Sequence, residues 1–153
     1  MRVYIPLSLA ELHQLFAGGT VTAAAAFGAT EELCRSHDVD PSDTEFGEFL
    51  AMTEAATSHV ANSDESRVGT RCLIIGAVDV DAAPCVGGRP GEVLISAPVG
   101  LNMLASFHVA EADSSAATVS DGSSFDAADL AWWAVQELPE LIHHLESKGR
   151  PHG

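Results

Sequence analysis

The segment FHVAEAD at 107–113 places His108, Glu111 and Asp113 close together in the sequence. Imidazole and carboxylate groups are ligands of zinc, and they also act as general acids and bases. In a β-strand, successive side chains point to opposite faces, so Glu111 and Asp113 face away from His108. We therefore predict a histidine at a sheet edge or at the margin of the core and assign no metal ligand. A small-molecule pocket near His108 and Glu111, with Arg89 as a further ligand-binding residue, is the alternative.

Two other groups of residues could support chemistry. Cys34 and His37 are three residues apart in a short predicted helix, where an imidazole could lower the pKa of a thiol. The segment CVGGRPGE at 85–92 could form an anion-binding nest around Arg89, but it has neither the GxGxxG order nor the ending of a P-loop. The sequence therefore assigns no catalytic residue and no cofactor, and it leaves open whether the protein is an enzyme.

The most distinctive segment is DLAWWAVQELPEL at 129–141, with two adjacent tryptophans. We predict a helix over 126–138 whose apolar face packs on a sheet. On a helical wheel, Trp133 falls among the acidic residues of the opposite face, which include Glu137, and Trp132 lies at the boundary. We predict that Trp133, Trp132 and Glu137 bind a partner. The alternative is that the chain's own segment 113–124 covers Trp133.

Composition limits the classes of partner. The chain has 153 residues and a net charge of −15, from 22 acidic and 7 basic residues. Such a surface repels the phosphate backbone of nucleic acids and also anionic membranes, so we expect neither as a partner. Three cysteines without a metal-binding spacing, no signal-peptide pattern and no long apolar run predict a cytoplasmic protein.

Capping signals define the first helices. Residues 2–6 have the composition of a strand, and Ser8 with Glu11 forms a capping box for a helix that ends near Gly18. Residues 20–29 have both helical and strand character, and we predict a strand. Thr30 caps a short helix. Ser42 is the expected cap of an amphipathic helix over 43–61.

The second half of the chain is rich in predicted strands, over 72–78, 92–99 and 106–112. A strand, helix and strand at the N-terminus imply a right-handed parallel crossover, whereas the later strands can pair as hairpins. The expected fold is α+β: a single mixed sheet of about five strands with helices packed against it, as in a ferredoxin-like or related sandwich. We expect one domain over 1–147 and a tail over 148–153.

Three blocks of the sequence, MRVYIPLSLAEL at 1–12, FHVAEAD at 107–113 and WWAVQELPEL at 132–141, resemble a family of small acidic actinobacterial proteins of unknown function. Trp133 and Val135 depart from that family's usual residues. The resemblance implies a cytoplasmic, single-domain protein and transfers no catalytic residue. The tryptophan Trp133, expected on the acidic face of the last helix, leads us separately to expect a non-enzymatic protein-association domain, acting as a homodimer or an adaptor.

Overall fold

A five-stranded sheet forms the centre of the protein. The computed structural model describes residues 2–23, 25–62, 73–84, 88–110 and 130–149. The strand order is β3-β1-β4-β8-β9, and all four pairings are antiparallel. The strands are β1 (Arg2–Leu7), β3 (Phe27–Gly28), β4 (Leu73–Asp79), β8 (Leu104–Ala110) and β9 (Ala131–Ala134).

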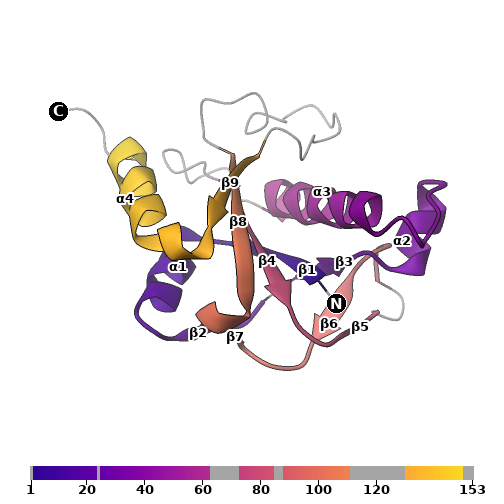
Figure 1. Ribbon diagram of the computed structural model, residues 1–153, viewed down its shortest axis with the longest axis horizontal. Helices are drawn as coiled ribbons and strands as arrows, with labels where there is room; N and C mark the ends of the chain where they lie inside the picture. The colour runs from indigo at the N-terminus through magenta and orange to yellow at the C-terminus, as the bar shows by residue number, and fades with distance from the viewer. Residues whose placement is uncertain (1, 24, 63–72, 85–87, 111–129, 150–153) are drawn as a thin grey trace.

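Helices cover both faces of this sheet (Figure 1). On one side lie α1 (Leu9–Phe16) and α4 (Leu138–Gly149), and on the other lie α2 (Glu31–Ser36) and α3 (Thr44–Asn62). Two hydrophobic clusters match these two sides. Alternate strand residues such as Ile5 and Phe107 join α1 and α4, whereas Tyr4 and Ile75 join α2 and α3. The period of two along each strand thus separates the two cores.

Two small antiparallel sheets complete the described fold. One pairs β2 (Thr20–Val21) with β7 (Val99–Gly100), and the other pairs β5 (Ala82–Pro84) with β6 (Val93–Ile95). A 3-10 turn, η1 (Leu101–Met103), leads from β7 into β8, and a second, η4 (Val135–Glu137), leads from β9 into α4.

Several sequence predictions are confirmed. The fold is α+β with a main sheet of five strands. The predicted capping box is present, because Ser8 Oγ accepts from the Glu11 N–H at 3.1 Å and the Glu11 carboxylate accepts from the Ser8 N–H at 2.9 Å. Thr30 caps α2. The predicted helix over 43–61 is α3, although its first turn is capped by Asp43 and not by Ser42, whose hydroxyl donates to Asp40.

The expected parallel crossover is wrong, and the main sheet is antiparallel instead of mixed. The segment after α1 forms two short strands, not one. β2 joins β7 outside the main sheet, and β3 pairs antiparallel with β1. Alanine has a low strand propensity, which is consistent with a break between the two short strands.

The helix predicted over 126–138 is also wrong. Residues 131–134 form strand β9 on the edge of the sheet, and the helix begins only at Leu138, with Pro139 in its first turn. All four residues of β9 pair with β8, and this pairing overrides the helical spacing of small residues such as Ala131 and Ala134. The start of the prediction, 126–129, lies outside the described residues.

Candidate protein-binding edge of the sheet

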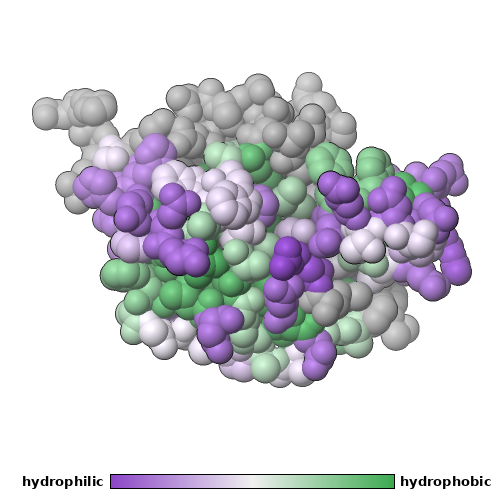
Figure 2. Space-filling model, in the orientation of Figure 1, coloured by the Kyte–Doolittle hydropathy of each residue, from purple (hydrophilic) through white to green (hydrophobic). Residues whose placement is uncertain are grey.

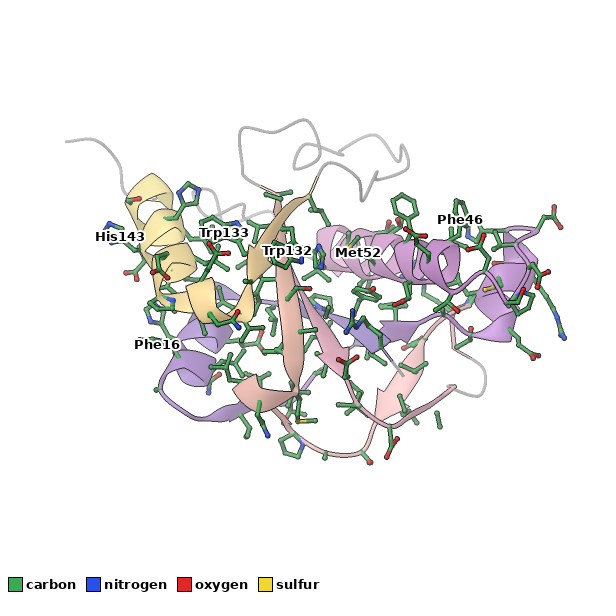
Figure 3. All side chains as sticks on the ribbon, in the orientation of Figure 1. Phe16, Phe46, Met52, Trp132, Trp133 and His143 are labelled. Atoms are coloured by element: carbon green, nitrogen blue, oxygen red, sulfur yellow. The ribbon has the colours of Figure 1, made fainter. Side chains whose placement is uncertain are left out.

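Strand β9 points its two tryptophans to opposite faces of the sheet (Figure 3). Trp133 points toward α4, where it packs against the core cluster, and its ring centroid is 5.6 Å from that of His144. Trp132 points toward the side of α3 and is 63% exposed. The helical wheel had placed Trp133 outside and Trp132 at the rim of the core. The structure gives Trp132 the more exposed position.

Trp132 lies on a part of the sheet that α3 covers little. The main contacts of α3 with the sheet are with β1, β3 and β4, on the half away from β9. Beyond that half, the cross-strand neighbour of Trp132 is His108 of β8. Met52, on α3, lies toward the same side as Trp132 (Figure 3). The indole of Trp132 therefore lies next to His108 on the outermost strand of the sheet, on the face that α3 covers little.

His108 sits in a mainly apolar setting on this face. Its Nε2 is 3.0 Å from the hydroxyl oxygen of buried Ser106, and its ring meets that of Tyr4 edge-on at a centroid distance of 6.4 Å. Burial lowers the pKa of His108 below its ordinary 6.5, and the positive charge of Arg2 lowers it further. The neutral imidazole is thus favoured. This agrees with the prediction of a histidine at the margin of the core.

Tyr4 is also held in its neutral form. Burial, followed by the charge of Glu48, raises the pKa of Tyr4 to about 12. The hydroxyl is therefore protonated over the physiological range and is unsuited to act as a base. Ser106 and His108 resemble two members of a hydrolase triad, but among the described residues no carboxylate bonds to the imidazole to orient it.

The outer side of β9 is not paired with any strand of the described residues. The Ala134 N–H donates to the Glu137 carboxylate at 3.0 Å, so it points away from β8. In an extended strand, residues two apart point their N–H and C=O groups the same way, which places those of Trp132 on the outer edge too. Glu137, predicted to bind a partner, thus caps one outward-facing position of the edge strand.

The other predicted ligand-binding residues do not join His108. Arg89 lies in the loop before β6, where its guanidinium pairs with Glu54 at 2.9 Å and stands 5.7 Å from the centre of the Phe27 ring. Phe27 is on β3, three strands from β8, which corresponds to about 14 Å. Glu111 lies outside the described residues. The structure therefore shows no convergence of Arg89 with His108.

Cys34 and His37, the other candidate pair, differ in exposure. Cys34 is buried in α2, and His37 is the exposed C-cap residue of that helix. Among the described residues, no three histidine, cysteine or acidic side chains are grouped as metal ligands would be. None of the described helices is both long and apolar enough to cross a bilayer.

The sequence contained a signal for this arrangement that helical periodicity obscured. Trp133 and Val135 are two residues apart, and both pack against the same core cluster, as alternate residues of an extended segment do. The roles of Ser106 and of the free edge depend on strand order, which the sequence alone did not define.

Comparison with known proteins gives one match. The model of a family of unknown function, DUF6912, matches residues 1–142. The resemblance to a family of unknown function, stated from three sequence blocks, is thereby confirmed. No curated protein and no solved structure matches the chain.

Proposed function

The chain belongs to the family of unknown function DUF6912, and we propose that it is a protein-association domain whose contact surface is the free edge of β9 with Trp132 at its centre. The observation that carries this proposal is the 63% exposure of Trp132 on an edge strand. Tryptophan is enriched among residues that dominate binding energy at interfaces, and truncating one can cost about 2 kcal/mol or more of binding.

The position of Trp132 distinguishes it from other exposed apolar side chains. Phe16 and Phe46 lie on helices, and Leu94 lies on the short strand β6, which is paired with β5. Among these four residues, Trp132 is the one on the edge of the main five-stranded sheet, whereas Leu94 lies in a separate sheet of two strands. Apolar surface also gathers below α4, toward α1 and β7 (Figure 2), but an exposed apolar patch without a backbone edge is a less specific feature.

The partner-binding roles of Trp132, Trp133 and Glu137 differ in this proposal. Trp132 supplies the contact. Trp133 fixes the strand by packing on the α4 side. Glu137 caps one outward N–H group and thereby limits how far a partner strand can extend. We further propose a cytoplasmic protein with one domain over 1–147, followed by a tail over 148–153.

Site-specific photocrosslinking in the cells that naturally contain the protein tests this function. A photoreactive amino acid replaces Ala131, an exposed alanine of β9, and in a control replaces Ala83, an exposed alanine of β5. We expect an adduct of discrete mass from position 131, and its loss when Trp132→Ala is added. An adduct of twice the chain mass identifies a second copy as the partner.

Absence of a specific adduct at position 131, or the same adducts at positions 131 and 83, contradicts the association function. Retention of the adduct in the Trp132→Ala background contradicts the assignment of Trp132 as the contact residue. Far-ultraviolet circular dichroism of each variant verifies that the fold is kept.

The second candidate function is binding of a small molecule beside His108. It is supported by the 3.0 Å contact between His108 Nε2 and Ser106 Oγ, next to an exposed indole. Aromatic side chains with a few converging polar groups are typical of such sites. Screening a small-molecule library by nuclear magnetic resonance tests it. Shifts at His108 and Ser106 that disappear in Ser106→Ala support a pocket, and an unchanged spectrum rejects it.

A further inference from the structure

We infer that the partner at the edge of β9 is an extended, basic segment of another protein, which adds a strand to the sheet and places a cationic side chain on the indole of Trp132. This inference rests on the proposed association function and specifies its partner. Three independent features of the described residues support it: the orientation of the backbone edge, the charge around it and the face of the exposed indole.

The backbone edge determines the shape of the partner. Trp132 has its N–H and C=O groups on the outer side of β9, because Ala134, two residues on, points its N–H away from β8. Addition of an extended peptide to such an edge satisfies these groups with main-chain hydrogen bonds. A helix offers no free backbone groups along its side and would leave them unpaired. The occupant is therefore extended at the level of Trp132.

Charge determines the chemistry of the partner. The chain carries −15, with 22 acidic residues and 7 basic ones, so a second copy would bring two strongly acidic surfaces together. Glu137 lies at the edge itself, and Glu140 is exposed in the first turn of α4. In Figure 2 the pale surface at β9 is bordered by hydrophilic side chains where η4 and α4 lie. A basic segment is complementary to this edge, and another copy is not.

The indole gives the cation a specific place. In a sheet, a residue directly opposite Trp132 on the added strand projects from the same face, with its Cβ about 5 Å from that of Trp132. An arginine there can lie over the indole, an arrangement that attracts a cation to the ring face. His108, on the other side of Trp132, is neutral at neutral pH and does not oppose the cation.

Glu137 defines one end of the added strand. Its carboxylate occupies the Ala134 N–H, so a partner strand that extends past Trp132 in that direction must displace it. Glu137→Gln keeps an acceptor for this N–H and removes one negative charge, whereas Glu137→Ala removes both. If charge attracts the partner, the glutamine variant binds it more weakly than the natural protein.

Peptide binding to the purified full chain tests the inference. The probe is an eight-residue peptide of alternating arginine and threonine, and Trp133→Phe makes Trp132 the sole tryptophan, so that its fluorescence reports binding at the edge. We expect saturable binding, and we expect Trp132→Ala to weaken it at least tenfold. Because that variant lacks the fluorescent reporter, its binding is measured by calorimetry. Leu94→Ala, which truncates a side chain of similar exposure, should bind normally.

Two further peptides separate strand addition from simple charge attraction. A peptide of alternating arginine and proline has the same charge but lacks half of the N–H groups, and we expect it to bind at least tenfold more weakly. A peptide of alternating glutamate and threonine should not bind. Equal binding of the proline peptide, or unchanged binding by the Trp132→Ala variant, overturns the inference.

The two experiments together distinguish failure of the basic-partner inference from failure of the association function. A specific crosslink at position 131 together with no binding of the arginine–threonine peptide rejects the basic partner and keeps the function. A crosslinked adduct made of two copies of the chain also rejects it, because the occupant is then acidic. No specific crosslink at position 131 rejects the function itself, whatever the peptide does.

Discussion

Trp132 of β9 and His108 of β8 lie directly opposite each other on antiparallel strands, on the face of the sheet that α3 leaves partly uncovered. Since the outward backbone of Trp132 makes this a non-hydrogen-bonded pair, the two side chains approach closely. The exposed indole and the half-buried imidazole therefore form one local unit. A substitution of His108 should therefore alter the fluorescence of Trp132, and a substitution of Trp132 should alter the nuclear magnetic resonance signals of His108.

The lowered pKa of His108 predicts a loss of stability on acidification. Because the folded pKa lies below the unfolded value of 6.5, the unfolded chain takes up the proton first. The contribution of His108 to stability is complete above pH 6.5 and falls as the pH decreases toward the folded pKa. Urea unfolding at pH 7.5 and pH 5 measures this loss. His108→Gln should lose less stability between these conditions than the natural protein.

A matched control for this experiment is His143→Gln, which replaces an exposed histidine of α4. It should show the same pH dependence as the natural protein. If the two variants respond identically to pH, the titration of His108 does not govern acid stability. Among the described residues, the polar and charged groups recorded next to His108 are Arg2, Tyr4 and Ser106, and Arg2 is itself paired with Asp79 at 3.0 Å.

Removal of the Ser106 hydroxyl should destabilise the fold slightly. Ser106→Ala leaves Nε2 of His108 without its 3.0 Å contact on a half-buried ring, which typically costs about 1 kcal/mol. Chemical denaturation measures the free energy of unfolding. In the His108→Phe background the same substitution should cost less, because the polar partner is already absent. Equal costs in the two backgrounds would show that the two groups are not coupled.

A side chain at Gly76 of β4 is predicted to crowd two leucines of the core. A Cβ at this position would lie 2.9 Å from Leu104 Cδ2 and 2.9 Å from Leu7 Cδ1, inside the buried core. Gly76→Ala should therefore destabilise the protein by about 1–3 kcal/mol through overpacking. Leu104→Ala opens space next to it, so the double variant should be more stable than the sum of the single changes predicts. Simple additivity would contradict overpacking against Leu104.

The Arg89–Glu54 pair should contribute little to stability. Arg89 is about half exposed, and exposed ion pairs typically contribute between about 0.2 and 1 kcal/mol. Arg89→Gln should lower the free energy of unfolding by about that amount, less so at high salt. The same loss at low and high salt would indicate that the contact with Phe27, 5.7 Å away, matters more than the ion pair.

Local signals were enough to predict much of the fold. The Ser8–Glu11 capping box, the Thr30 cap and the long helix α3 all depend on residues close in sequence. The buried strand β4 was predicted from a continuous apolar run, as expected for a strand covered on both faces. The class of the fold followed from the order of these elements.

Long-range pairing explains what the sequence did not reveal. Residues 131–134 are compatible with a helix, and only β8 makes them a strand. That single difference reverses the exposure of the two tryptophans and converts Glu137 from one acid on a helix face into a cap on the sheet edge. His108 was placed at the margin of the core because its neighbours in a strand could be inferred without knowing the partner strand.

The most direct test of the orientation of β9 is collisional quenching by acrylamide of two single-tryptophan variants at low protein concentration. Trp133→Phe retains Trp132, which should be strongly quenched and emit at long wavelength, as expected for a side chain that is 63% exposed. Trp132→Phe retains Trp133, which should be quenched less and emit at shorter wavelength because it packs against the core. Stronger quenching of Trp133 than of Trp132 would contradict the strand and the binding edge built on it.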